Sequence, residues 1–261
     1  MTDVATEPVG HLLRGWRERR RLTQLALANV AEVSTRHLSF VESGRSRPTA
    51  DMVLRLAEHL DVPLRERNTL LLAAGHAPSY PSRALTDTPM AAVSDAIDRI
   101  LDAHLPFPAV VVDREWDMIA GNDAVALLTE GAAPHLLEPP VNVLRLSLHP
   151  DGLAPRIVNL AQWRTHLLDR LRREIAVTAD ASTAALLDEL TGYPGGEDDT
   201  HDPSALLVPL TITAGDTVLS LFSTTTVFGT PRDVTVSEIA IESFHPSDDA
   251  TRDFFAAAAG R

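Results

Sequence analysis

The sequence has 261 residues, of which 44% are hydrophobic and 23% are charged, a composition with enough apolar material for about two folded domains. It contains no cysteine, which excludes disulfides, cysteine-ligated zinc and thiol nucleophiles. Because the formal net charge is −13, a nucleic-acid binder is compatible with the sequence only if basic residues gather in one region.

The charge is divided unevenly along the chain. Residues 1–76 hold 11 Arg and 9 acidic residues, a net charge of +2, whereas residues 77–261 hold 12 Arg and 27 acidic residues, a net charge of −15. In the first segment the arginines gather in the ranges 14–21 and 45–47. A positive surface is therefore predicted for the first segment alone.

Membrane and secretion signals are not found in the sequence. It has no run of about 18 apolar residues, and its first ten residues carry acids where a signal peptide carries bases. We therefore expect a cytoplasmic protein that does not associate with a membrane.

Helix signals fill residues 8–76. Apolar residues recur with the helical period from Val9 onward, and Thr23, Ser34 and Thr49 stand where N-caps of further helices are expected. Three residues separate the second and third periodic segments, a link that forces the sharp crossing typical of a helix-turn-helix. The prediction is an all-α domain of five helices, the first beginning near Val9 and the others covering residues 24–31, 35–42, 50–60 and 63–74.

Residues 21–48 resemble the phage-repressor-like helix-turn-helix family, often called the Xre family, in the stretch RLTQLALANVAEVSTRHLSFVESGRSRP. The matching features include Thr23 and Gln24 at the start of the second helix and the loop from Gly44 to Pro48. One departure is Glu32, which stands in the turn where the family usually has a glycine. Because glycine is able to take a positive φ there, we expect the turn at Glu32 either to carry mild strain or to differ slightly in geometry.

The resemblance implies a surface for double-stranded DNA. Gln24 matches the residue that braces the DNA backbone, and Arg36, near the start of the third helix, has the fork geometry for guanine O6 and N7. The loop arginines are expected to contact phosphates, and the alternative for each is a solvated surface charge. The expected DNA-binding residues are Gln24, Ser34, Thr35, Arg36, His37, Ser39, Ser43, Arg45 and Arg47.

The remainder of the chain has a different pattern. Residues 77–89 combine three prolines with Ser and Thr and lack apolar periodicity, so domains are expected at 1–76 and 90–261 with a linker between them. An exposed acidic loop is expected at residues 194–203. The order of elements predicts an α+β domain with an antiparallel sheet and helices on one side, as in a PAS-type sensor. The elements are a helix at 90–105, strands at 109–112 and 116–120, several helices, and strands at 205–213, 218–226 and 234–244.

From about Val9 to His245 the chain resembles the MmyB-like regulators. The resemblance is carried by LRERNTLLLAAGHAPSY, PAVVVDREWDMIAGN, PPVNVLRLSLHPDGLAPRIVN and FSTTTVFGTPRDVTVSEIAIESFHP. It implies an Xre-type helix-turn-helix joined to a PAS-like domain that senses a small apolar ligand, such as a fatty acid. Because one helix-turn-helix reads few base pairs, we expect a homodimer on a near-palindromic operator.

A slender apolar ligand requires an apolar slot with polar groups at one end. Aliphatic candidates for the walls are Ile119, Leu144, Leu148 and Leu167, and Arg145 and Arg156 are candidates for a carboxylate. The alternatives are an ordinary hydrophobic core and structural pairing of the polar residues. The expected ligand-binding residues are Phe107, Trp116, Asn122, Arg145, His149, Arg156, Asn159, Trp163, Phe222 and Phe228.

Catalytic and cofactor motifs are lacking. The sequence has neither a phosphate-binding glycine loop nor HExxH, and its ten histidines show no metal-ligand spacing, so we expect no enzyme, no metal and no cofactor. Two alternatives for the second domain stay open. It could be a protein-interaction or dimerisation module with a filled core, or it could hold haem or flavin, which would colour the purified protein. A cavity of several hundred Å³ would favour the sensor.

Overall fold

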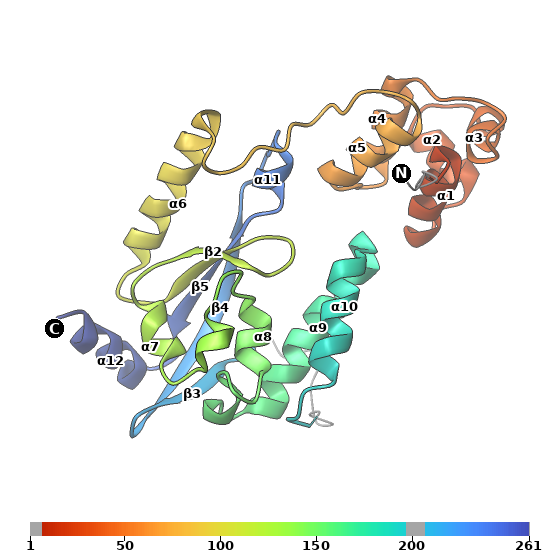
Figure 1. Ribbon diagram of the computed structural model, residues 1–261. Helices are drawn as coiled ribbons and strands as arrows, with labels where there is room; N and C mark the ends of the chain where they lie inside the picture. The colour runs from red at the N-terminus through yellow and green to blue at the C-terminus, as the bar shows by residue number, and fades with distance from the viewer. Residues whose placement is uncertain (1–6, 197–206, 261) are drawn as a thin grey trace. The chain divides into compact units, whose positions relative to one another are not determined.

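The computed structural model describes residues 7–196 and 207–260 and consists of two compact units, each described here by itself (Figure 1). The first unit holds the residues up to Arg83 together with the short segments Ala176–Thr178 and Thr230–Ser237, and the second holds the others. The division at Arg83 falls inside the segment predicted as a linker. Most of the predicted acidic loop lies outside the described residues.

The first unit is built on the five predicted helices. The hydroxyls of Thr23, Ser34 and Thr49 accept hydrogen bonds from backbone N–H groups at 3.1, 3.1 and 3.3 Å, which confirms the predicted N-caps. The apolar faces of the helices meet in one core that includes Trp16 and Leu38. The helices are α1 (Val9–Arg19), α2 (Gln24–Val30), α3 (Thr35–Glu42), α4 (Ala50–His59) and α5 (Leu64–Ala73).

The turn between α2 and α3 is left-handed at Glu32, where φ is 53°. The next residue closes the turn, since the Val33 N–H donates to the Ala28 carbonyl at 2.9 Å. The turn therefore keeps the positive φ without the glycine, and a residue with a Cβ costs on the order of 1 kcal/mol in this region.

The second unit is organised around a five-stranded antiparallel sheet with the strand order β2-β1-β5-β4-β3 (Figure 1). The strands β3, β4 and β5 form the predicted meander, and β1 joins it by pairing with β5. The strands are β1 (Ala109–Val112), β2 (Met118–Gly121), β3 (Leu210–Ala214), β4 (Thr217–Val227) and β5 (Ala240–Pro246). The helices of the later part of the chain are η1 (Thr88–Met90), α6 (Ala91–His104), α7 (Val125–Thr129), η2 (Pro134–Leu136), α8 (Val143–Leu148), η3 (Ala154–Arg156), α9 (Leu160–Thr178), α10 (Ala181–Thr191), α11 (Val234–Ser237) and α12 (Asp249–Ala259). Across the described ranges, no helix has the length and apolar character needed to cross a membrane.

Helices cover both faces of the sheet, so the prediction of helices on one side was wrong. On one face Ala109 and Val111 pack with α6, while on the other Val110 and Val112 belong to the core formed with α8, α9 and α10 (Figure 1). The physical reason lies in β1, whose sequence AVVV is buried at every position. A strand that is apolar on both faces must be covered on both.

Three predicted strands begin later than expected, and one of them is the strand predicted over residues 205–213, which begins as β3 at Leu210. The strand predicted from Trp116 begins at Met118, because Trp116 has a φ of 66° and cannot continue a strand. The strand predicted over residues 234–244 starts as the helix α11, and β5 covers only Ala240–Pro246. Here Asp233 acts as the helix cap, since its Oδ1 accepts from the Thr235 N–H at 2.9 Å.

The left-handed turn at Glu32 generates a stability prediction. We expect Glu32→Gly to stabilise the first unit by about 0.5–1 kcal/mol, because glycine adopts a positive φ without a Cβ clash. The matched control is Glu58→Gly in the exposed surface of α4, which should instead cost up to about 1 kcal/mol. Hydrogen exchange of peptides from residues 8–76 at increasing urea concentrations measures both changes. Destabilisation by both variants would contradict the strain at Glu32.

Candidate DNA-binding surface and ligand cavity

A buried ion pair joins α1 to α3 in the first unit. Arg17 binds Glu42 through two hydrogen bonds, Nε to Oε1 at 2.7 Å and Nη2 to Oε2 at 2.9 Å, and its Nη1 donates to the Leu22 carbonyl at 2.8 Å. The two side chains are only 10% and 3% exposed. The hydrogen bond to Glu42 raises the pKa of Arg17. Since both charges are paired and hydrogen-bonded, the pair fixes how α3 lies on α1.

Two further contacts hold the same arrangement. A Cβ on Gly10 would lie 2.3 Å from the Val41 carbonyl oxygen, so α1 and α3 approach too closely there for any other residue. Gln24, at the start of α2, donates from Nε2 to Glu42 Oε2 at 2.8 Å. Gln24 thus links α2 to the end of α3 through Glu42.

The residues predicted to read DNA lie at the exposed beginning of α3. Arg36 and His37 are exposed, while Thr35 and Ser39 are half-buried. The Arg36 guanidinium lies 5.4 Å from the centre of the Phe40 ring, a cation–π contact that orients a long side chain over the helix surface. The hydroxyl of Ser34 is used as the helix cap described above.

The loop after α3 presents the predicted phosphate contacts. Ser43, Arg45 and Arg47 are all exposed. Gly44 has a φ of 73°, and the N–H groups of Arg45 and Ser46 both donate to the Phe40 carbonyl, at 2.8 and 3.1 Å. This glycine turn folds the loop back against the end of α3.

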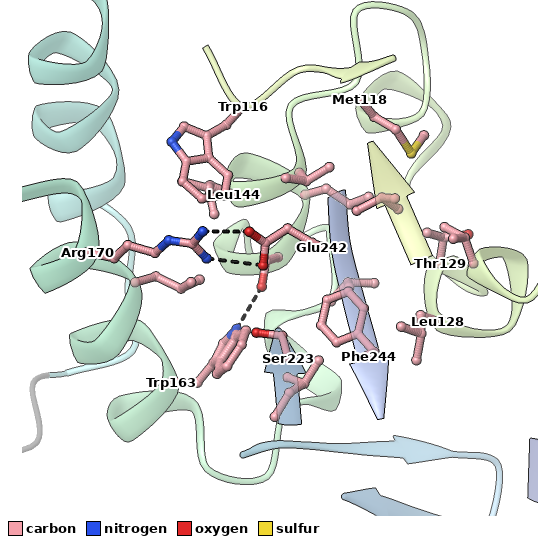
Figure 2. Close-up of a pocket in the computed structure, with 18 of the residues that line it drawn as sticks. Trp116, Met118, Leu128, Thr129, Leu144, Trp163, Arg170, Ser223, Glu242 and Phe244 are labelled. Atoms are coloured by element: carbon pink, nitrogen blue, oxygen red, sulfur yellow. Dashed lines mark hydrogen bonds and ion pairs between the residues drawn. The ribbon is translucent and has the colours of Figure 1, made fainter. Parts of the chain in front are cut away.

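A cavity of about 90 Å³ lies inside the second unit, between the sheet and the helices α7, α8 and α9 (Figure 2). It is much larger than the roughly 10–15 Å³ needed for one water molecule, and smaller than the roughly 300–1,000 Å³ of a drug-sized site. The lining is largely apolar. It consists of Val110, Trp116, Met118, Val125, Leu128, Thr129, Val143, Leu144, Leu146, Ser147, Leu153, Trp163, His166, Leu167, Arg170, Leu210, Ser223, Glu242 and Phe244.

An ion pair forms the polar end of this cavity. Figure 2 shows Arg170 of α9 pointing toward Glu242 of β5, and the distances are 2.5 Å from Nη2 to Oε1 and 3.2 Å from Nη1 to Oε2. Thr225 donates to Glu242 Oε1 at 2.8 Å, and the Arg170 guanidinium lies 4.4 Å from the centre of the Trp116 ring. The cavity therefore carries an opposed pair of charges at one end, with Glu242 buried.

The tryptophans that line the cavity are held by their indole N–H groups. Trp163 donates to Ser147 Oγ at 3.0 Å, and Trp116 donates to Glu174 Oε2 at 3.2 Å. Burial raises the pKa of Glu174. These bonds fix the orientation of both rings in the cavity lining.

Among the predicted apolar ligand residues, Trp116 and Trp163 line the cavity, together with Leu144 and Leu167. Phe107, Phe222 and Phe228 are not part of the lining. Phe107 packs edge-on against Phe255, with ring centres 6.0 Å apart. Phe222 stacks on His245 at 5.0 Å, and Phe228 packs in the cluster on the α6 side of the sheet.

The predicted polar ligand residues make structural contacts outside the cavity lining. Arg145 binds Glu189 through bonds of 2.7 and 2.8 Å, and the hydrogen bond from Arg145 lowers the pKa of Glu189 to about 2. Arg156 donates to the carbonyls of Leu128, Glu130 and Thr213. These contacts correspond to the structural pairing considered as the alternative.

The remaining polar candidates also serve the backbone. Asn122 Oδ1 accepts from the Ala109 N–H at 3.1 Å, while its Nδ2 donates to two carbonyls. Asn159 Oδ1 accepts from the Thr211 N–H at 3.0 Å, and its Nδ2 donates to the Pro209 carbonyl at 2.7 Å. His149 Nδ1 accepts from the Asp151 N–H at 3.0 Å. The two asparagines thus tie distant backbone segments together, whereas His149 closes a local turn.

Sequence reasoning missed the charged residues that matter most in both units. Glu42 lies one helical turn after the buried Leu38, so its inward position could have been inferred from the period. Ala240, Glu242 and Phe244 are every second residue of β5 and therefore share its cavity face. Arg170 follows Leu167 by one turn of α9. A charged residue at an inward position is the signal common to all three.

Two family models match the chain. A model for a helix-turn-helix domain matches residues 8–70, and a model for an MmyB-like transcription regulator ligand binding domain matches residues 93–258. A solved structure titled "Structure of an RNA-binding Light-Oxygen-Voltage Receptor" is similar at 14% sequence identity and a TM-score of 0.30. That alignment covers 98% of this chain and 64% of the other, so this chain spans less than two thirds of that protein's length. Comparison with curated proteins gave no match.

The buried pair in the first unit generates a prediction. Glu42→Ala should destabilise that unit by about 3–5 kcal/mol, because it leaves the Arg17 charge buried without its partner. The double variant Arg17→Met with Glu42→Leu removes both charges, so the first unit should lose much less stability than in Glu42→Ala. Hydrogen exchange of peptides from residues 8–76 measures both free energies. Equal losses in the two variants would show that packing, and not an orphaned charge, causes the effect.

Proposed function

The chain belongs to the family of MmyB-like transcription regulators, whose ligand-binding domain covers residues 93–258, and on that premise we propose what its two sites bind. With a helix-turn-helix domain preceding a ligand-binding domain, it is a DNA-binding transcriptional regulator. We propose that the protein is cytoplasmic, that its helix-turn-helix is of the Xre type, and that it binds its operator as a homodimer. A small apolar, fatty-acid-like ligand in the cavity shifts the affinity for that operator.

The DNA-binding proposal is supported by the exposed face of α3. Its first turn carries Arg36 and His37 in the exposed position that a recognition helix requires, and the exposed loop arginines Arg45 and Arg47 follow directly after the helix. Under this proposal, Arg36 reads a base edge and the loop residues contact phosphates. Glu42 contributes indirectly, because it holds Gln24 and Arg17 in place.

The ligand proposal rests on the apolar lining of the cavity, the single observation that carries it, since the volume of about 90 Å³ is below the several hundred Å³ that would favour a sensor. A ligand of ordinary size requires roughly 300–1,000 Å³. The lining must therefore open as the ligand enters, and Met118, a half-buried and flexible side chain in the lining, is suited to move. A slender, single-chain ligand requires the smallest opening.

The paired charges restrict the head group of such a ligand. Within the described lining, Arg170 is the one arginine, so it is the proposed anchor for an acidic head group. Glu242 binds the same guanidinium and repels a second carboxylate. A fatty acid therefore has to displace Glu242 or share a proton with it, whereas an alcohol of equal chain length does not.

The DNA-binding surface generates a paired prediction. Arg36→Ala should cost about 1–3 kcal/mol on the operator and relax discrimination at one base pair, whereas Arg47→Ala should weaken binding to all sequences and reduce the salt slope by about 1. The operator is first selected from a random DNA pool with the wild-type protein, and affinities are then measured at several salt concentrations. If both variants bind the selected operator as tightly as the wild type, α3 is not the recognition helix.

The cavity generates a prediction about ligand charge. Glu242→Gln keeps the shape of the side chain and removes its charge, so a long-chain fatty acid should bind about tenfold more tightly or better, a gain of about 1.4 kcal/mol. The alcohol of equal chain length should bind equally well to both proteins. Native mass spectrometry with added lipid measures the bound fractions. Ser223→Ala, a small change in the same lining, is the matched control.

The same spectra test the ligand proposal itself. A small apolar molecule released from the purified wild-type protein would support a sensor and identify the compound to titrate against operator binding. An empty spectrum that stays empty with added lipid would overturn it and favour a second domain that binds a protein partner. A coloured protein would point to haem or flavin instead.

A further inference from the structure

Two histidines and an aspartate meet at the surface of the second unit, outside the cavity lining. His135 lies in η2, His149 directly follows α8, and Asp151 lies in the next turn. One ligand-capable atom from each residue lies within 4.8 Å of the other two. The sequence does not predict this group, because His135 comes from a different segment and the histidines lack motif spacing.

The backbone holds the two segments together beside these side chains. The Ala133 N–H donates to the Asp151 carbonyl at 2.8 Å, and the Gly152 N–H donates to the His149 carbonyl at 2.9 Å. A Cβ on Gly152 would lie 2.2 Å from the Leu146 carbonyl oxygen, so the turn that carries Asp151 can close this tightly only with glycine. Both segments therefore present their side chains from a fixed frame.

The hydrogen bonding of His149 determines which of its ring nitrogens carries the lone pair on the Asp151 side. Its Nδ1 accepts from the Asp151 N–H at 3.0 Å, which places the ring proton on Nε2. The same Nδ1 lies 4.0 Å from Asp151 Oδ2. The ring centre of His135 lies 5.7 Å from that of His149. A cation bound at Nδ1 has to displace the Asp151 N–H from this lone pair, and water can then accept from that N–H because Asp151 is exposed.

We propose that His135, His149 and Asp151 bind one divalent first-row transition-metal ion, with zinc as the reference ion. Imidazole nitrogens and a carboxylate oxygen are the donors that such ions take in a chain without cysteine. Zn–N bonds of about 2.0–2.1 Å place neighbouring ligands about 3.3 Å apart, so the side chains close by about 1.5 Å. His135 and Asp151 are exposed and can rotate to do so. Water completes the coordination.

Calorimetric titration of the tag-free, full-length protein with ZnCl₂ after chelator treatment tests the site. We expect one zinc ion per chain, and affinity at least about tenfold weaker in both His135→Gln and Asp151→Asn. The matched control is His59→Gln, an exposed histidine on α4, which should bind as the wild type does. Since the two substituted side chains are exposed, both variants should keep the wild-type circular dichroism spectrum.

A second readout identifies the donors. Co²⁺ in place of zinc should give a visible absorption band that His135→Gln removes and His59→Gln retains. The proposal is overturned if zinc does not bind saturably, or if the variants of His135 and Asp151 bind it as tightly as the wild type. The DNA-binding and ligand proposals keep their own tests, because the three residues lie outside the predicted DNA-binding surface and the cavity lining.

Discussion

Burial of β1 on both faces is the constraint on which the second unit depends. Because Val110 and Val112 face one layer of helices while Ala109 and Val111 face α6, the sheet cannot leave either face to water. The pairing of β1 with β5 extends this alternation, with Val111 opposite Ile241. The period of two then assigns every residue of β5 to one layer or the other.

The position of Glu242 follows from that register. Val110 pairs with Glu242, so the carboxylate faces the cavity side, where Arg170 of α9 neutralises it. A slip of one residue would place Ile241 in the cavity and bury Glu242 against α6. Since an unpaired buried carboxylate costs several kcal/mol, the ion pair selects one register as well as marking the polar end of the cavity.

The first unit uses a buried charge pair in the same way. Arg17 and Glu42 contribute little net stability compared with an apolar pair, since desolvation offsets much of their attraction. Their contribution is orientation. Two directional hydrogen bonds between planar groups fix how α3 lies on α1 more tightly than apolar contacts do. In each unit, therefore, a buried ion pair positions the residues proposed for binding, which is to DNA in the first unit and to an apolar ligand in the second.

Local signals in the sequence predicted the helices well. They did not predict contacts between residues that are far apart in the sequence. The caps at Thr23 and Ser34 depend on bonds to residues three positions away, so a short stretch contains all the information. Periodicity predicts that Phe222 and Trp163 are apolar and partly inward, yet it does not say which layer each joins, and they lie on opposite faces of the sheet. The partner of Arg145 is Glu189, and no local pattern connects them.

The proposed metal site and the cavity share two segments of the chain, which gives them a physical route for coupling. Leu128 and Thr129 line the cavity shortly before η2, and Leu146 and Ser147 line it just before His149. A cation that ties η2 to the end of α8 would restrain the wall that has to open for a ligand. By linkage, any such effect is reciprocal, so a ligand that spreads this wall would weaken metal binding by the same factor. The size of that factor depends on how far Leu128 and Leu146 must separate, since both belong to the same packed core.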